Sequence, residues 1–281
     1  MMEYFTFNDG NRYPALALGT VWIQGKEGLG TIQKALDLGY RAFDTSTNYY
    51  NEGMLGQAIR QSSLDREDIF VSAKLPGAAH QYDKAIKYLE ESLFRMGLDY
   101  FDKYLIHWPL PMKDQYVEAW QALIDAQKDG LIKSIGVSNF QPDHLDKIIT
   151  ETGVTPASNQ IERHPYFNNL EVVEANRDRG IVTEAWSPFG RGILNDVLTN
   201  ATVLGLARKY DKQAAQVILN WNYQAGILSN PRADRKSHLR ANLASFDFKL
   251  DPDDIKALNN LDQGEAGRVE NQHPDIYEEY V

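Results

Sequence analysis

Short apolar runs and longer amphipathic stretches alternate along this chain. The apolar runs have the length and the β-branched content of buried strands, whereas most stretches between them, such as residues 31–38, repeat their apolar positions with the period of a helix. A turn at Asn8, Asp9 and Gly10 predicts a β-hairpin ahead of the first run. Eight runs are expected to form strands: residues 15–18, 41–44, 69–75, 104–108, 132–138, 156–161, 181–187 and 227–229.

The alternation of strands and helices predicts an α/β protein with a parallel sheet. An open, doubly wound sheet and a (β/α)8 barrel both alternate in this way. The dinucleotide fingerprint G-x-G-x-x-G of the open fold is absent, because Gln33 and Asn195 stand where a third glycine would follow the two Gly-x-Gly pairs. No linker divides the 281 residues. The sequence therefore predicts one domain, residues 1–281, folded as a TIM barrel whose bottom is closed by the N-terminal hairpin.

The charge balance argues against a polyanionic partner. Asp and Glu number 39 and Lys and Arg number 29, which gives a formal net charge of -10. Nucleic-acid binding requires basic residues gathered on one face, and the chain contains no basic run. We therefore expect a small-molecule partner and no nucleic acid.

Residue types also bear on the compartment and on metal chemistry. The chain has no cysteine, which excludes disulfides and thiolate chemistry, and its 6 histidines show no spacing typical of metal ligands. The first residues, MMEYFTFNDGNRYP, lack the apolar centre of a signal peptide, and no apolar run approaches the length of a membrane span. These features predict a cytoplasmic protein without a membrane segment or a metal site.

Four polar residues follow predicted strands in the first half of the chain. Asp44 and Tyr49 lie in FDTSTNYYNE, Lys74 lies at the end of VSAK, and His107 lies at the end of YLIH. In a barrel the carboxyl ends of all strands surround one mouth, where the catalytic residues of barrel enzymes lie. We therefore expect these four side chains to meet there.

Together the four residues predict an acid/base site. A tyrosine hydroxyl has a pKa of about 10 in water, and a nearby ammonium such as that of Lys74 lowers this value. Asp44 would keep the buried Lys74 charged, and His107 would hold a substrate carbonyl against the Tyr49 hydroxyl. Each residue alone also has an ordinary interpretation, as a helix cap, a half-buried aromatic, a solvated charge or a hydrogen-bonded histidine. Only their joint occurrence at strand ends favours acid/base chemistry.

Five segments stand in the chain in this order: FDTSTNYYNE, SAKLP, LIHWP, GVSNF and NQIERHPY. Together they resemble those of the aldo-keto reductases, in particular the small bacterial members similar to diketogluconate reductases. The resemblance implies a monomer that uses NADPH to reduce aldehydes and ketones, such as small carbonyls, dicarbonyls or keto sugars. It also implies that Tyr49 is the general acid, that Lys74 and Asp44 tune its pKa, and that His107 orients the carbonyl.

The resemblance assigns the cofactor to residues further along the chain. Gln160, Ser138 and Asn139 match the groups that bind the nicotinamide carboxamide, and Trp186 matches the aromatic side chain that stacks on its ring. The remaining contacts that the resemblance implies are Thr20, Val21 and Asp44 beside the nicotinamide, and Ser187, Phe189, Gly190 and Arg191 over the pyrophosphate.

The segment NPRADRKSHLRAN, expected at the adenosine end, departs from the family pattern. Arg232 and Ala233 stand where a lysine and a serine are usual, and His238 stands where an arginine is usual. Arg232 still offers a planar fork suited to phosphate, and Arg235 adds a second cation. We therefore predict a preference for NADPH over NADH, with His238 and Asn242 as further contacts.

The predicted substrate walls are mostly aromatic and select no particular carbonyl. They are Trp22, Tyr50 and Trp108, with His80, Met112 and Tyr277 as further candidates. Tyr50 stands where the family commonly has glycine, and it either narrows the entrance or packs on the surface.

Two other functions are compatible with parts of this pattern. One is a non-catalytic NADPH-binding regulatory or sensor protein of the same fold, against which the complete set of four polar residues argues. The other is a barrel isomerase or lyase acting on phosphorylated sugars. That function requires a phosphate-binding loop after the seventh and eighth strands and needs no nicotinamide.

Overall fold

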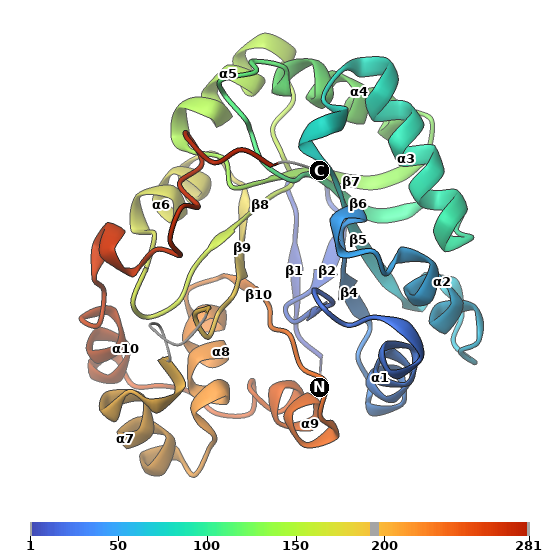
Figure 1. Ribbon diagram of the computed structural model, residues 1–281. Helices are drawn as coiled ribbons and strands as arrows, with labels where there is room; N and C mark the ends of the chain where they lie inside the picture. Colours follow the sequence, from blue (N-terminus) through green and yellow to red (C-terminus); the bar gives the residue numbers. More distant parts are fainter. Residues whose placement is uncertain (1, 192–196, 280–281) are drawn as a thin grey trace.

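Eight parallel strands form a barrel at the centre of the molecule in the computed structural model, which describes residues 2–191 and 197–279 (Figure 1). Leu16 forms a parallel bridge with Ser229, and the amide of Gly19 donates to the Pro231 carbonyl at 3.1 Å, so that the first and last strands meet. The predicted (β/α)8 barrel is confirmed. The strands, each paired with the next, are β3 (Leu18–Gly19), β4 (Ala42–Asp44), β5 (Phe70–Leu75), β6 (Phe101–Ile106), β7 (Ile132–Ser138), β8 (Ser158–Glu162), β9 (Val182–Trp186) and β10 (Leu228–Asn230).

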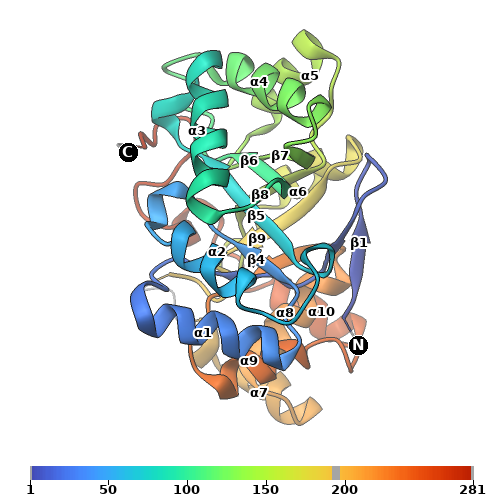
Figure 2. The same ribbon diagram turned by 90° about the vertical axis from the view of Figure 1, so that its right-hand side faces the viewer.

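Helices connect the strands and cover the outside of the barrel (Figures 1 and 2). Two of them, α7 and α10, are additional to the repeating strand–helix unit, and they pack with α8 around a separate apolar cluster that includes Val203, Trp221 and Leu258. The helices are α1 (Gly25–Leu38), α2 (Glu52–Arg60), α3 (Tyr82–Met96), α4 (Tyr116–Lys128), α5 (Pro142–Thr152), α6 (Leu170–Asp178), α7 (Ala201–Tyr210), α8 (Ala214–Gln224), α9 (Lys236–Leu243) and α10 (Pro252–Asn259).

The apolar runs form strands because the helices outside and the side chains inside bury both faces of the sheet. All residues of β6 are buried, for example. β7 coincides with its predicted run, residues 132–138, whereas the other strands begin or end at other residues than their runs. The first run, residues 15–18, is longer than β3, and its residue Leu16 pairs with Ser229 of β10 only in an isolated bridge. The strand β6 ends at Ile106, so His107 lies in the loop that follows it. Pairing with neighbouring strands, and not apolar content alone, sets these limits.

The N-terminal hairpin closes the bottom of the barrel, as predicted. Strands β1 (Tyr4–Thr6) and β2 (Arg12–Pro14) pair in antiparallel register. In Figure 2 the hairpin and the C-terminus lie at opposite ends of the molecule. The side chains of Phe7 and Tyr13 are buried against residues at the amino ends of the barrel strands, namely Ala17, Ala42, Ala157 and Leu228.

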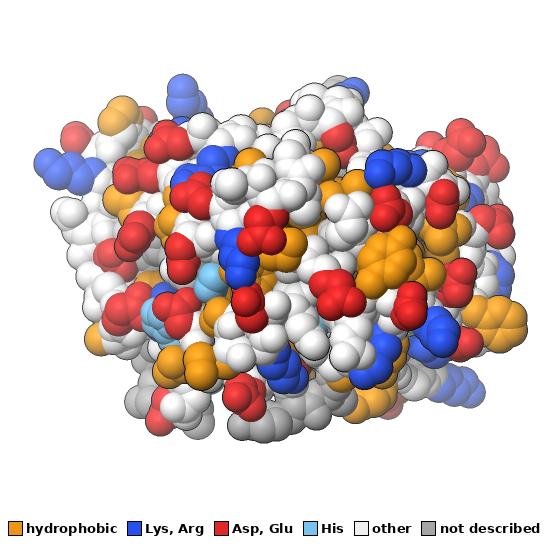
Figure 3. Space-filling view, turned by 90° about the horizontal axis from the view of Figure 1, so that it is seen from above, with side chains coloured by type: hydrophobic (Ala, Val, Ile, Leu, Met, Phe, Trp, Pro, Cys, Tyr) orange, Lys and Arg blue, Asp and Glu red, His pale blue; other side chains and the backbone are white. Residues whose placement is uncertain are grey.

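The surface carries charges of both signs. On the face shown in Figure 3, acidic side chains spread over the whole view and basic ones are interspersed among them. No helix within residues 2–191 and 197–279 combines the length and apolar character of a membrane span. Within those same ranges, no three His, Asp or Glu side chains gather closely enough to hold a metal ion.

Candidate active site

A cleft of about 820 Å³ opens at the carboxyl ends of the barrel strands. Its volume is in the usual range for small-molecule sites. Three of the four predicted acid/base residues, Asp44, Tyr49 and His107, line the cleft directly, and Lys74 lies beneath it. The barrel thus brings together residues that are separated in the sequence.

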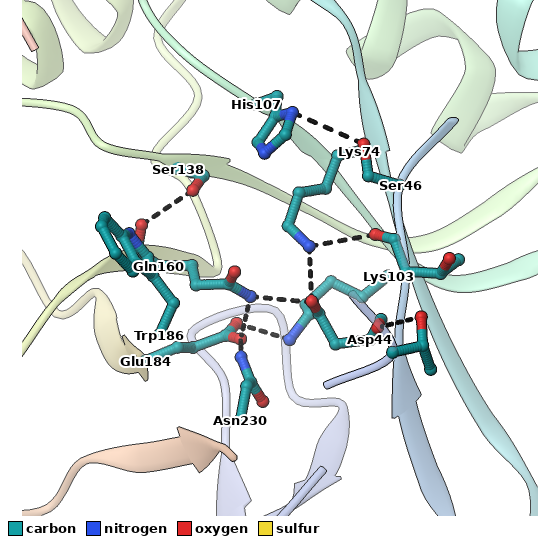
Figure 4. A network of polar contacts seen from close by, with 12 residues as sticks. Asp44, Ser46, Lys74, Lys103, His107, Ser138, Gln160, Glu184, Trp186 and Asn230 are labelled. Atoms are coloured by element: carbon teal, nitrogen blue, oxygen red, sulfur yellow. Dashed lines mark hydrogen bonds and ion pairs between the residues drawn. The ribbon is translucent and has the colours of Figure 1, made fainter. Parts of the chain in front are cut away.

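Asp44 and Lys74 form a buried ion pair below the cleft (Figure 4). Asp44 is the last residue of β4, and Lys74 lies near the end of the neighbouring strand β5. The Lys74 Nζ lies 2.5 Å from Asp44 Oδ1 and donates a second hydrogen bond to the Thr45 carbonyl at 3.0 Å. The same ammonium lies 5.3 Å from the centre of the Tyr49 ring. This order, Asp44 to Lys74 to Tyr49, is the one predicted from the sequence.

The ionisation of Lys74 follows the prediction, whereas that of Tyr49 does not. Burial alone would lower the pKa of Lys74, but Asp44 and Tyr49 outweigh it and raise this pKa above its ordinary value. Burial raises the pKa of Tyr49, and Lys74 lowers it, as predicted. The carboxylates of Asp44 and Glu279 add to the rise, so the pKa of Tyr49 stays above its ordinary value. The prediction of a net lowering was wrong because it left out desolvation.

His107 lies beside Tyr49 in the cleft. The centres of the two rings are 6.1 Å apart and their planes stand at 79°. One ring nitrogen, Nδ1, lies 2.6 Å from a carboxylate oxygen of Glu279 in the C-terminal tail. This partner could not be predicted locally, because Glu279 lies in no strand or helix and is far from His107 along the chain.

Amide and indole groups form a platform next to the acid/base residues. The Trp186 Nε1 donates to Asn139 Oδ1 at 2.8 Å, and the Asn139 side chain in turn donates to the His107 carbonyl at 2.9 Å. The Gln160 Nε2 donates to Asp44 Oδ2 at 2.8 Å, and the Ser138 hydroxyl donates to the Gln160 carbonyl. The platform therefore presents a flat indole and oriented amides to the cleft.

A second buried ion pair supports this platform from inside the barrel (Figure 4). The Lys103 Nζ of β6 lies 2.5 Å from Glu184 Oε1 of β9, and neither side chain is exposed. The other oxygen of Glu184 accepts from Gln160 and from Asn230, each at 3.1 Å. This pair was not predicted from the sequence, although an acidic and a basic residue inside two apolar strands, FDKYLI and VTEAW, were a sign of it.

Two arginines lie at the other end of the cleft. The guanidinium carbons of Arg191 and Arg232 lie 5.0 and 5.8 Å from the centre of the Trp22 ring. Arg232 also bonds to Asp234 at 3.0 Å. The two cations fit an anionic group such as a pyrophosphate.

The structure also places the other predicted cofactor residues. Arg235 and His238 are exposed at the start of α9, outside the cleft lining, and Asn242 is buried beside Tyr40. The cleft lining includes the remaining members of the predicted set: Thr20, Val21, Ser187, Phe189 and Gly190.

Three of the six predicted wall residues do not line the cleft. The side chain of Tyr50 is 75% exposed, because the left-handed backbone at this residue (φ 54°) ends the 3-10 helix η1 (Thr47–Tyr49) at the surface. Met112 is 81% exposed and lines only a small adjacent hollow. His80, which lies in the loop that follows β5, is fully buried. Trp22, Trp108 and Tyr277 do line the cleft, as predicted.

The whole barrel and its cleft match a known family. The aldo/keto reductase family model matches residues 15–263. The chain belongs to the aldo/keto reductase family. The methylglyoxal reductase DkgA of Escherichia coli O157:H7 is 43% identical over 256 residues, which cover 91% of this chain and 92% of that protein.

Other members of the aldo/keto reductase family agree with this assignment. The 2,5-diketo-D-gluconic acid reductase B of Corynebacterium sp. is 40% identical over 274 residues, which cover 98% of this chain and 97% of the relative. The crystal structure of a Gox0644 mutant in complex with NADPH superimposes with a TM-score of 0.91 at 37% identity and covers 98% of each chain. This aldo/keto reductase is therefore an NADP-dependent oxidoreductase of carbonyl compounds, with NADPH or NADP+ as its cofactor.

The cleft fits this cofactor. Both hydrogens of the Gln160 amide are donated to carboxylates, which leaves the amide oxygen as an acceptor for a carboxamide. The Oδ1 of Asn230, which borders the cleft, is buried and finds no hydrogen-bond partner in the part of the chain that the structure describes. A ligand amide would satisfy such an acceptor.

Proposed function

We propose that this protein reduces small aldehydes, dicarbonyls or keto sugars to alcohols with Tyr49 as the general acid. The observation that carries the proposal is the position of the Tyr49 and His107 side chains in one cleft, directly above the Asp44–Lys74 pair and beside the Trp186 platform. The relatives' printed names, methylglyoxal reductase and 2,5-diketo-D-gluconic acid reductase, support dicarbonyls and keto sugars as substrate classes.

Each polar residue has a separate role in the proposed reaction. Bound NADPH supplies the hydride that reduces the carbonyl carbon. Tyr49 gives its proton to the carbonyl oxygen as negative charge develops there, and a phenolate remains on the tyrosine. The Lys74 ammonium stabilises that phenolate, and Asp44 keeps Lys74 charged. His107 holds the carbonyl oxygen next to the Tyr49 hydroxyl.

The cofactor roles are part of the same proposal. We assign the nicotinamide to the Trp186 and Gln160 platform, with Ser138 and Asn139 at its carboxamide, the pyrophosphate to Arg191 and the 2′-phosphate to Arg232. All of these groups line one cleft, which supports the assignment. The monomeric state and the cytoplasmic location stay predictions from the sequence.

Substitution of Tyr49 tests the acid assignment. Tyr49→Phe removes only the hydroxyl, so we expect turnover to fall about 10²- to 10⁴-fold, the usual contribution of a general acid, while NADPH binding is kept. The measurements are NADPH consumption with methylglyoxal, a diketogluconate and an aromatic aldehyde, and NADPH binding by fluorescence titration.

Two outcomes would contradict the proposal. Full activity of Tyr49→Phe would exclude this tyrosine as the acid. If the wild-type protein bound NADPH but reduced no carbonyl in a wide panel, the non-catalytic regulatory function would be favoured. Tyr50→Phe is the matched control, because its ring lies next in sequence but is exposed outside the cleft.

A further inference from the structure

The C-terminal tail crosses the mouth of the barrel and carries a buried carboxylate. In Figure 1 the tail, in dark red, runs from α10 towards the centre of the barrel. The Tyr277 ring stacks against Trp108, with 4.2 Å between the ring centres. Two residues further on, the Glu279 side chain is only 3% exposed and borders the cleft. The tail thus places an acidic group among the residues of the active site.

The Glu279 carboxylate bonds to three of the loops that follow barrel strands. Its Oε1 lies 2.6 Å from His107 Nδ1 and accepts from Asn48 Nδ2 at 2.5 Å. Its Oε2 accepts from the backbone amide of Gly77 at 2.6 Å. Burial acts to raise the pKa of Glu279, but His107 and the Gly77 amide outweigh it and lower this pKa below its ordinary value. At neutral pH the group is therefore a carboxylate.

A carboxylate in this position decides which nitrogen of His107 carries a proton. An ionised carboxylate only accepts hydrogen bonds, so His107 Nδ1 must be the donor. In a neutral imidazole the other nitrogen, Nε2, then holds a lone pair and cannot donate to a carbonyl oxygen. Nε2 donates only when the ring is doubly protonated. The Ser46 hydroxyl, 3.4 Å from the same Nδ1, is the more distant neighbour.

We propose that Glu279 is a positioning residue that fixes the proton of His107 on Nδ1, so that His107 donates to a substrate carbonyl only in its doubly protonated form. The consequence for the substrate rests on the proposed carbonyl reduction, whereas the position of the proton on Nδ1 does not. The tail is then part of the catalytic apparatus.

The charged neighbours are compatible with this pairing. Burial lowers the pKa of His80 to about 4, so this histidine is neutral at pH 7 and does not compete for the Glu279 charge. The other titratable groups that face the pair or its neighbours are Tyr49, Lys74, Asp44 and Lys113.

Glu279→Gln is the sharpest variant because it keeps the shape of the side chain. The Gly77 amide needs an acceptor, so the glutamine oxygen is expected at the position of Oε2 and its NH₂ group towards His107. Asn48 can turn its own amide to accept from that group. The glutamine NH₂ then donates to Nδ1 of the neutral ring and moves the ring proton to Nε2.

Nitrogen-15 NMR of the ring nitrogens reads this proton directly, without substrate. Above the pH range in which imidazoles titrate, we expect the Nδ1–H form of His107 in the wild-type protein and the Nε2–H form in Glu279→Gln. Glu278→Gln, an exposed neighbour in the same tail, is the control and should match the wild type. A wild-type His107 with its proton on Nε2 would overturn the proposal, even if no variant folds.

Kinetics give a second readout. Above the pH range in which imidazoles titrate, kcat/KM for carbonyl reduction should be about 10²-fold higher in Glu279→Gln than in the wild type, because only the variant's neutral ring donates to the developing oxyanion. Equal kcat/KM values for the two proteins in that range would contradict the proposal. Absence of any carbonyl reduction would contradict the proposed function and leave the NMR result standing.

Discussion

His80 is a buried histidine without polar contacts. Its side chain is fully buried, and neither ring nitrogen has a hydrogen-bond partner in the part of the chain that the structure describes. Burial lowers its pKa from 6.5 to about 4, although Glu279 acts in the opposite direction. The folded protein therefore holds this ring neutral at a pH where the unfolded chain would protonate it.

The neutral state of His80 predicts a loss of stability in acid. As the pH falls below 6.5, His80 is protonated in the unfolded chain, whereas in the folded state it stays neutral until about pH 4. This difference in the pKa of His80 corresponds to about 3 kcal/mol of unfolding free energy. That stabilisation is present at neutral pH and is fully lost below the pKa of His80 in the folded state. His80→Leu should remove this part of the pH dependence.

Urea unfolding of the wild type and of His80→Leu, measured across this pH range, checks the prediction. The difference in unfolding free energy between the two proteins should change with pH and be constant above neutrality. A difference that does not vary with pH would show that His80 titrates alike in the folded and unfolded states.

At the scale of secondary structure, the Lys103–Glu184 pair joins β6 to β9 across the interior of the barrel. These strands are not neighbours in the sheet, so the pair is a link through the barrel centre. Lys103 also lies 3.9 Å above the ring of Tyr13 in the hairpin. A chain of contacts therefore runs from the bottom of the barrel through Glu184 and Gln160 to Asp44.

Removal of one partner of this pair should be costly. Lys103→Met leaves the Glu184 charge buried and unpaired, so we expect a loss of about 3–5 kcal/mol of unfolding free energy. The double variant Lys103→Met, Glu184→Leu should recover much of that loss because no charge remains. The control is Lys133→Met on β7, whose ion pair with Asp102 is partly exposed and is worth about 0–1 kcal/mol. Denaturant unfolding of the wild type, Lys103→Met, Glu184→Leu, the double variant and the control provides the measurement, and the idea would be refuted if the effects of the two single substitutions at Lys103 and Glu184 simply added.

The existence of the strands could be predicted from the sequence, but apart from β7 their limits could not. Strands of a parallel barrel are buried on both faces, so they are visible as apolar runs, but their ends depend on pairing with strands distant in sequence. The same holds for the site. Asp44, Lys74 and His107 follow apolar runs and were found, whereas Glu279 lies in a tail whose contacts form only in the folded molecule. The raised pKa of Tyr49 could not be predicted, because it depends mainly on the burial of this side chain, which no motif shows.

At the scale of the whole molecule, the acid/base residues and the arginines that would hold the cofactor's phosphates lie in different parts of one cleft. The acid/base residues lie among β4, β5 and β6, whereas Arg191 and Arg232 follow β9 and β10. A dinucleotide would therefore lie across the barrel mouth, with its reactive ring at one end and its phosphates at the other.

Arg232 should matter more for NADPH than for NADH. Arg232→Ala removes a cation suited to the 2′-phosphate, so we expect KM for NADPH to rise about 10- to 100-fold, the range for hydrogen bonds to charged groups, with little change for NADH. Arg240→Ala is the control, because this exposed arginine of α9 does not line the cleft. Steady-state kinetics with both cofactors provide the measurement, and equal changes for NADPH and NADH would contradict the role of Arg232 at the 2′-phosphate.

The opposite positions of the hairpin and the tail have a practical consequence for anyone who produces this protein. An affinity tag or fusion partner attached at residue 281 would be tethered two residues from Glu279, beside the mouth through which substrate must enter. A tag joined ahead of β1 would be tethered to the hairpin, on the side of the molecule opposite the tail (Figure 2). Kinetic constants measured with a carboxyl-terminal tag should therefore be compared with those measured with an amino-terminal tag. A difference between them would be an effect of the tag and not a property of the enzyme.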